Sequence, residues 1–201
     1  MRAAVVVPIR SFEAGKSRLG TRLDPSARAE LLRAMAENVV AAAGAMPVAV
    51  VSDAREVRRW AAALGLSVLD DPGTLDLAAA AGLGWAARAG FGRVVIAHAD
   101  LPLATTLAPV AADGARPVVT AVPCHRDDGT PVLSLPTTAT GFVFAYGPGS
   151  FRRHAAAARS AGLAFRVRRD PRLGRDVDAP EDLVGLPPLA AAASRRALLG
   201  A

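Results

Sequence analysis

The sequence predicts a single-domain α/β protein whose mostly parallel central sheet is covered by helices. Short apolar runs alternate along the chain with segments of helical periodicity, which is the pattern of parallel strands joined by helices. At 201 residues and 52% hydrophobic content, the chain is long enough for one such domain with a sizeable core. We expect one folded domain over residues 1–185 and a tail over residues 186–201, which is Ala-rich and has no obvious packing partner.

The first half of the chain alternates regularly between the two kinds of element. The first strand is expected at residues 3–9, and Asp24-Pro25 then opens a helix that continues to residue 43. Further strands are expected at residues 47–52, 67–69 and 93–97, and further helices at 54–64 and 75–89. This order predicts consecutive βα units.

The second half is less regular. The expected elements are a short helix near residues 105–112, strands at 117–122, 132–135 and 141–144, a helix at 149–161, a strand at 164–168 and a helix opened by Pro180. No internal repeat is present in the sequence.

Composition narrows the classes of partner. The net charge of +6 favours anions, but the arginines are spread along the chain and aromatic residues are only 4%, so we expect a small anionic molecule and no nucleic acid. Cys124 is the only cysteine, which excludes an internal disulfide and a cysteine-rich metal site.

The sequence predicts a cytoplasmic protein with no membrane partner. No apolar stretch reaches the ~20 residues that a membrane span needs. The apolar segment at residues 3–9 is too short for a signal peptide and lacks a small-residue cleavage site.

One lysine stands among 23 arginines, in the loop after the first strand, within Ala14-Gly15-Lys16-Ser17-Arg18-Leu19. A compact ammonium on a flexible stem suits phosphate oxygens, although composition alone would also leave one lysine somewhere. Four cations fall within 13 residues of this loop, namely Arg10, Lys16, Arg18 and Arg22. They predict a triphosphate site, the alternative being a solvated basic turn. A Walker P-loop does not fit, because Arg10 stands where its first Gly is required and the helix begins only near Pro25.

Acidic residues follow another buried strand. Asp100 comes three residues after the segment 93–97 and just before Leu101-Pro102, where a carboxylate can hold Mg²⁺ together with substrate phosphates. Asp176 and Asp178 would face the same side of an extended segment. The alternative for this pair is helix N-capping, since Asp178 precedes Ala179-Pro180.

Two glycine-containing turns are further candidates for anion binding. They are Gly129-Thr130 and the segment Tyr146-Gly147-Pro148-Gly149-Ser150, which precedes a helix. Both can present backbone N–H groups and hydroxyls, and the alternatives are an ordinary turn and a helix cap. The three histidines, His98, His125 and His154, lack metal-ligand spacing and are interpreted as structural or surface residues.

Five segments, taken in chain order, carry a family resemblance. They are Ala14-Gly15-Lys16-Ser17-Arg18-Leu19; His98-Ala99-Asp100-Leu101-Pro102; Asp128-Gly129-Thr130 with Val132-Leu133; Tyr146-Gly147-Pro148-Gly149-Ser150 with His154; and Asp176-Val177-Asp178-Ala179-Pro180-Glu181-Asp182-Leu183. Over about residues 4–183 the chain resembles the 2-phospho-L-lactate guanylyltransferases, a family that includes the phosphoenolpyruvate guanylyltransferases of coenzyme F-420 biosynthesis.

The resemblance implies a fold, a set of ligands and roles for particular residues. The fold is a small three-layer nucleotidyltransferase fold, similar to that of molybdenum-cofactor guanylyltransferases, and a homodimer is compatible with the family. The implied ligands are GTP, a small phosphorylated carboxylic acid and Mg²⁺. The implied site comprises metal ligands Asp100, Asp176 and Asp178; acceptor-binding Thr130, Gly147 and Ser150; nucleotide-binding Arg10, Lys16 and Asp76; and, for catalysis, Lys16, Arg18 and Asp100.

The chain also departs from the family pattern. Arg10 replaces a common Lys, Gly15 and Ser17 replace Ala and Thr, and Asp76 replaces an Asn. The first three exchanges preserve charge or small size. The fourth removes two hydrogen-bond donors and adds a charge, so it bears on the nucleotide contacts and on the choice of base.

The expected reaction is guanylyl transfer from GTP to the phosphate of phosphoenolpyruvate or 2-phospho-L-lactate, with release of pyrophosphate. One alternative is a nucleotide-sugar-dependent glycosyltransferase, whose related fold also places an Asp motif after a strand; such enzymes usually have a carboxylate two residues earlier, where this chain has His98. Another alternative is a nucleotide-binding protein without catalytic activity. The sequence does not choose among phosphoenolpyruvate, 2-phospho-L-lactate and 3-phosphoglycerate, because these acceptors differ by contacts worth only ~1–3 kcal/mol.

Overall fold

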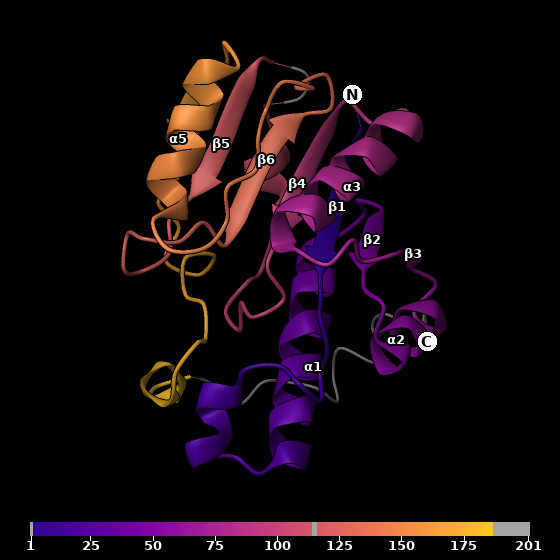
Figure 1. The fold of residues 1–201 in the computed structure, drawn as a ribbon, viewed down its shortest axis with the longest axis vertical. Coiled ribbons are helices and arrows are strands. Elements are labelled where there is room, and N and C mark those ends of the chain that lie inside the picture. Colours follow the sequence, from indigo (N-terminus) through magenta and orange to yellow (C-terminus); the bar gives the residue numbers. More distant parts are fainter. Residues whose placement is uncertain (1, 114–115, 187–201) are drawn as a thin grey trace.

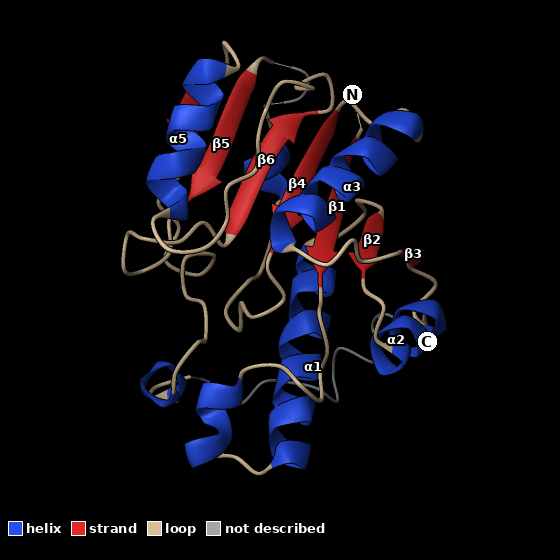
Figure 2. Cartoon of the chain, in the orientation of Figure 1, coloured by secondary structure: helices blue, strands red, loops and turns tan. Residues whose placement is uncertain are grey.

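In the part of the chain that the structure describes, six of the seven strands run in the same direction and one runs against them. The computed structural model describes residues 2–113 and 116–186, and its sheet has the order β3-β2-β1-β4-β6-β5-β7 (Figures 1 and 2). The strands are β1 (Ala3–Pro8), β2 (Val48–Val51), β3 (Ser67–Leu69), β4 (Arg93–Ala97), β5 (Val118–Val122), β6 (Val132–Pro136) and β7 (Ala164–Val167). Strand β6 is antiparallel to both of its neighbours, and the other pairs are parallel, which confirms the mostly parallel sheet.

Helices cover both faces of the sheet and make three layers. Helices α1 (Pro25–Ala42), α2 (Arg55–Ala63) and α4 (Ala108–Ala111) pack on one face. Helices α3 (Leu75–Arg88) and α5 (Ser150–Ser160) pack on the other face and lie in front of the sheet in Figure 1. Two short 3-10 helices, η1 (Ser17–Thr21) and η2 (Pro180–Leu183), lie in the loops.

Strand β1 is buried on both faces, which explains its unbroken apolar sequence. Val5 and Val7 belong to the core under α1 and α2, whereas Ala4 and Val6 belong to the core under α3. Parallel strands covered on both faces have this composition because every side chain leaves water. The approach of α3 is close: a Cβ added to Gly82 would lie 2.5 Å from the Val6 side chain.

The reversal of β6 decides which loops meet. The carboxyl ends of β1 and β4 lie at one edge of the sheet, and Ala97 at the end of β4 pairs with Val132 at the beginning of β6. The residues just before β6 therefore reach the same edge as the residues just after β1 and β4. The backbone N–H of His98 donates to the carbonyl of Pro131 at 2.9 Å, which fixes this junction.

Most of the predicted elements are present, with two corrections. The predicted strand at residues 141–144 is wrong: Phe142 and Phe144 are buried and Val143 is exposed, but the segment makes no ladder in the described chain. An extended segment lying on the face of a sheet produces the same alternation as a paired strand. The helix expected at 105–112 is reduced to Ala108–Ala111.

The predicted tail, apart from residue 186, lies outside the described residues, as do residues 114–115. Among the helices that are described, none has the length and apolar composition needed to cross a membrane.

Candidate active site

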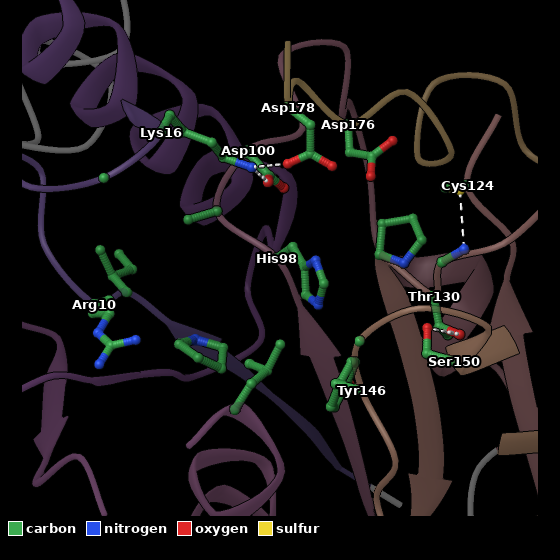
Figure 3. A pocket seen from close by; sticks show the side chains of 18 of the residues that line it. Arg10, Lys16, His98, Asp100, Cys124, Thr130, Tyr146, Ser150, Asp176 and Asp178 are labelled. Carbon is green, nitrogen blue, oxygen red and sulfur yellow. Dashed lines mark hydrogen bonds and ion pairs between the residues drawn. The ribbon is translucent and has the colours of Figure 1, made fainter. Parts of the chain in front are cut away.

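A pocket of about 690 Å³ opens at the sheet edge where these loops meet, a size suited to small-molecule ligands. Its walls come from the loops after β1 and β4, the turn between β5 and β6, the segment before α5 and the segment before η2. In open α/β sheets this edge is the usual ligand site. Figure 3 shows the acidic side chains in the upper part of the view, with Arg10 on the left and Thr130 and Ser150 on the right.

The loop after β1 is anchored from α2. The hydroxyl of Ser11 donates to Glu56 at 2.7 Å, and the backbone N–H of Phe12 donates to the same carboxylate oxygen at 3.2 Å. The Phe12 ring is buried against Trp60. The loop then ends at Lys16, whose φ of 50° lies in the left-handed region, before η1 begins. The long helix starts only at Pro25, so the arrangement is not that of a P-loop.

The loop after β4 is held from α1 and from the segment before η2. The side-chain amide of Asn38 donates to the carbonyls of Leu101, Pro102 and Ala104 at 2.9–3.1 Å. The backbone N–H of Val177 donates to the carbonyl of Asp100 at 3.1 Å. This bond places the two acidic segments, which are far apart in the sequence, side by side.

The acidic segment before η2 is organised by a buried carboxylate, Asp182. It accepts the backbone N–H groups of Asp178 and Ala179, each at 2.9 Å, and a guanidinium N–H of Arg126 at 2.7 Å. The N-cap of η2 is Ala179 and not Asp178, so the capping interpretation of Asp178 is wrong. The Asp178 carboxylate is thereby left available to the pocket.

Lys16 lies between two of the predicted acidic residues (Figure 3). Its ammonium forms ion pairs with Asp100 and Asp178. Burial disfavours the ammonium and is the largest single influence on it, but Asp100 and then Asp178 outweigh burial and raise the pKa of Lys16 above its ordinary value. The second oxygen of Asp100, Oδ1, is buried and has no hydrogen-bond partner in the described residues.

The other two carboxylates differ in their protonation tendencies. Burial, followed by repulsion from Asp100 and Asp178, raises the pKa of Asp176, whose Oδ1 lies 3.1 Å from Nδ1 of His125. Burial also acts to raise the pKa of Asp178, but the hydrogen bond and charge of Lys16 outweigh it and the pKa is lowered. As the side chains stand, no three His, Cys, Asp or Glu residues in the described chain are arranged to hold a metal ion.

The opposite wall of the pocket carries two hydroxyls. The Ser150 hydroxyl donates to Oγ1 of Thr130 at 3.3 Å, and both residues are almost fully buried at the pocket wall. Gly147 has a φ of +96°, a conformation that L side chains rarely adopt. Asp128 accepts the N–H of Gly149 at 2.9 Å and thus satisfies one of the donors at the start of α5.

A family model described as "Guanylyl transferase CofC like" matches residues 3–187. The chain belongs to this family. It is 37% identical to the phosphoenolpyruvate guanylyltransferase of Rubrobacter xylanophilus, over 92% of this chain and 94% of that protein. It is 32% identical to the 2-phospho-L-lactate guanylyltransferase of Methanothermobacter thermautotrophicus, over 91% of this chain and 83% of that protein. As a member of the guanylyl transferase family, the protein is a nucleotidyltransferase.

Solved structures agree on the fold. A structure described as a putative nucleotide-diphospho-sugar transferase from Desulfovibrio desulfuricans G20 has a TM-score of 0.75 at 17% identity and covers 99% of this chain and 97% of its own. A nucleotidyl transferase from Methanothermobacter has a TM-score of 0.64 at 16% identity and covers 90% of this chain and 94% of its own. These likenesses confirm the predicted nucleotidyltransferase fold, and the family membership does not favour the glycosyltransferase alternative.

The pocket of this family member brings together most of the residues that the sequence singled out. Those at its wall are Arg10, Lys16, Arg18, Asp100, Thr130, Gly147, Ser150, Asp176 and Asp178. Asp76 is not among the wall residues. It lies in the first turn of α3, and its carboxylate accepts the backbone N–H of Tyr146 at 2.6 Å.

Several residues around the site had no binding role predicted from the sequence. His98 and Tyr146 line the pocket with ring centroids 5.3 Å apart, and His98 Nε2 and the Tyr146 hydroxyl are buried without partners in the described residues. His125 lies beside Asp176, and Arg126 lines the wall and binds Asp182. The position of His98 two residues before Asp100 was a usable signal; nothing in the sequence linked Asp182 to Arg126.

Proposed function

We propose that the protein transfers GMP from GTP to the phosphate of a small phospho-carboxylic acid and releases pyrophosphate, as a step of coenzyme F-420 biosynthesis. Its membership of the guanylyl transferase family supports this proposal. The observation that carries this proposal is that Lys16 and three carboxylates lie opposite a hydroxyl pair within one pocket. A triphosphate needs cations and a metal site, and a second anion needs neutral donors at a distance from those carboxylates.

Phosphoenolpyruvate is the acceptor that the relatives favour. The relative from Rubrobacter xylanophilus, at 37% identity, and one from Sphaerobacter thermophilus, also at 37%, are named phosphoenolpyruvate guanylyltransferases. The relative named for 2-phospho-L-lactate and one named for 3-phospho-D-glycerate, from Phenylobacterium zucineum, are each 32% identical. We therefore rank both of these acceptors below phosphoenolpyruvate.

The reaction requires positioning more than proton transfer. A phosphate oxygen of the acceptor attacks the α-phosphorus of GTP, a P–O bond forms, and the bond to pyrophosphate breaks. Because the attacking phosphate is already ionised, no general base is needed, and the enzyme must hold two anions that repel each other. In this proposal Lys16 and Arg18 bind the triphosphate, Arg10 contacts the nucleotide, and Thr130, Gly147 and Ser150 hold the acceptor.

The acidic side of the pocket fits a hard divalent cation. Asp100, Asp176 and Asp178 offer carboxylate oxygens, the ligands that Mg²⁺ prefers, and the buried Oδ1 of Asp100 lacks a partner in the described residues. When bound, Mg²⁺ would neutralise charge between the two substrates. Since the Lys16 ammonium now lies between Asp100 and Asp178, it would turn from the carboxylates to the triphosphate.

Pyrophosphate release tests the proposed function. The protein is incubated with Mg²⁺, GTP and, in separate reactions, phosphoenolpyruvate, 2-phospho-L-lactate and 3-phosphoglycerate, and ATP and CTP replace GTP as controls. We expect release with GTP and one acceptor. Asp100→Asn should abolish it while leaving the fold intact. The matched control is Asp70→Asn. The Asp70 carboxylate is exposed, pairs with Arg58 and lies outside the pocket, so this substitution should leave pyrophosphate release unchanged.

Two results would contradict the proposal. Transfer or hydrolysis of a GDP-sugar, without pyrophosphate release from GTP, would favour a glycosyltransferase. Tight GTP binding without turnover on any phospho-acid would favour a nucleotide-binding protein that is not an enzyme.

A further inference from the structure

A fully buried histidine lies directly behind the hydroxyl pair of the pocket. His154 is on α5 and is 0% exposed, packed against the Tyr146 and Phe142 rings at centroid distances of 4.7 and 6.0 Å. Both ring nitrogens have partners at 3.1 Å: Nε2 faces the backbone N–H of Ala145, and Nδ1 faces Oγ1 of Thr130. His154 itself does not line the pocket, so any effect on a ligand passes through Thr130.

The partner of Nε2 determines the tautomer of His154. A backbone N–H can only donate, so Nε2 must accept and carries no proton. Burial lowers the pKa of His154 to about 4, so the ring is neutral at pH 7. A neutral imidazole has one N–H. The proton is therefore on Nδ1, and Nδ1–H donates to the hydroxyl oxygen of Thr130.

This assignment orients the hydroxyls. Thr130 Oγ1 accepts one hydrogen bond from Nδ1 of His154 and one from the Ser150 hydroxyl. These two bonds occupy both lone pairs of the Thr130 oxygen. The hydroxyl hydrogen of Thr130 then has no acceptor among the described residues and points away from both His154 and Ser150. If instead Thr130 donates to Ser150, the hydrogen left over belongs to Ser150. In either case the pair keeps one O–H hydrogen to donate, and both residues border the pocket.

The start of α5 leaves few other donors at this wall. The N–H groups of Gly149, Ser150 and Phe151 are bound to the Asp128 carboxylate, the Gly147 carbonyl and the Asp128 carbonyl, at 2.9–3.0 Å. In the opposite tautomer, Nδ1 of His154 would accept the Thr130 hydrogen, and the Ser150 hydrogen would remain bound to Thr130. Only lone pairs of the two hydroxyl oxygens would then face an anion. The tautomer therefore decides whether the hydroxyl pair attracts or repels an acceptor oxygen.

We propose that His154 is a positioning residue that makes the Thr130–Ser150 pair a hydrogen-bond donor to a phosphate or carboxylate oxygen of the acceptor. This inference rests on the proposed function, because it assumes that the acceptor binds at this wall. It assigns His154 no contact with the reacting atoms.

Two substitutions separate this role from simple packing. His154→Asn places an amide N–H near the position of Nδ1 and keeps a donor to Thr130, whereas His154→Gln places an amide oxygen near Nε2 and keeps the acceptor for Ala145. We expect His154→Gln to raise the acceptor KM about tenfold, as for loss of one hydrogen bond to a charged group, and to leave the GTP KM unchanged. His154→Asn should stay within about threefold for both substrates.

Thr130→Val tests whether Thr130 transmits the effect of His154 to the acceptor. It should raise the acceptor KM as much as His154→Gln does, and the double variant should be no worse than either single one, since both interrupt one chain of hydrogen bonds. Equal losses in His154→Asn and His154→Gln, or a rise in the GTP KM as well, would assign His154 a packing role only and overturn the inference.

A spectroscopic measurement on the unaltered protein does not depend on turnover or on the variants folding. The ¹⁵N chemical shifts of His154 at pH 7 should be those of a neutral ring protonated at Nδ1. A ring protonated at Nε2, or a charged ring, would overturn the inference even if guanylyl transfer is demonstrated. Absence of guanylyl transfer together with the Nδ1 tautomer would instead contradict the proposed function and leave the hydroxyl orientation standing.

Discussion

At the scale of single residues, Lys16 is held by charge against two unfavourable influences. Its ammonium is mostly buried, and its backbone adopts a left-handed φ of 50°, which costs a residue other than Gly about 1 kcal/mol or more. Asp100 and Asp178 compensate by surrounding the ammonium with negative charge. Strain and burial that persist together at a pocket wall are typical of functional residues.

Lys16→Arg should lower the rate of pyrophosphate release at least tenfold while preserving the positive charge. The guanidinium is a wide planar fork, and it cannot replace a compact ammonium between two carboxylates or follow the same path to a triphosphate. Thermal melting measured alongside the rate checks that the fold is kept. An unchanged rate would mean that the single lysine reflects composition alone.

At the scale of elements, the sequence predicted the strands better than their directions. Apolar runs such as Val5–Val7 identify buried strands, and the carboxyl ends of parallel strands share an edge of the sheet. The sequence therefore predicted that the loops carrying Lys16 and Asp100 lie close together. Hydrophobic period does not encode direction, so the reversal of β6, which brings Thr130 to this edge, was not predictable. Hydrophobic period also does not show whether a segment is paired: residues 141–144 alternate like a strand, but the chain directly after them is held by side chains, because the N–H groups of Ala145 and Tyr146 donate to His154 and Asp76.

The link between α1 and the loop after β4 can be tested at Asn38. Asn38→Ala removes the amide that binds three carbonyls of the loop, and we expect a loss of about 1–3 kcal/mol in the free energy of unfolding. Because the loop carries Asp100, kcat should fall as well. Urea denaturation and pyrophosphate release are the measurements. A stable variant with unaltered kcat would show that Asn38 does not position Asp100.

The packing of α3 on β1 can be tested with two glycines of one helix. Gly82→Ala adds a methyl group 2.5 Å from the Val6 side chain, and we expect a loss of about 1–3 kcal/mol in the free energy of unfolding. Gly84→Ala is the matched control: its nearest neighbour, 3.2 Å away, is the mobile end of Arg88, so the better helix propensity of Ala should give equal or greater stability. Equal stability of both variants would contradict the close approach of α3.

At the scale of the whole molecule, the pocket joins two parts of the sheet with different tasks. The loops after β1 and β4 supply Lys16 and Asp100, and the β5–β6 turn and α5 supply Thr130 and Ser150. The residues at the pocket wall could be predicted from the sequence, because they have chemically suitable side chains and follow the ends of strands. Residues that support them from behind, such as Asp182 and His154, were not, because their roles depend on contacts between segments distant in the sequence.

Burial of His154 should make the stability of the whole protein depend on pH between about 6.5 and 4. The pKa of His154 is about 4 in the folded protein and the ordinary 6.5 in the unfolded chain. As the pH falls through this range, the unfolded chain binds a proton that the folded protein does not, so the free energy of unfolding should fall by up to about 3 kcal/mol. Above the ordinary pKa this contribution is complete and constant.

Urea denaturation between about pH 4.5 and 7.5 checks this dependence, with His154→Asn as the comparison because it lacks the titrating ring. Asp176, whose pKa is raised, acts in the opposite direction near the acid end, but it is present in both proteins and cancels in the difference. The difference in the free energy of unfolding between the unaltered protein and His154→Asn should therefore decrease steadily as the pH falls. A gap that stays constant over the range would show that His154 is not the group that resists protonation in the folded state.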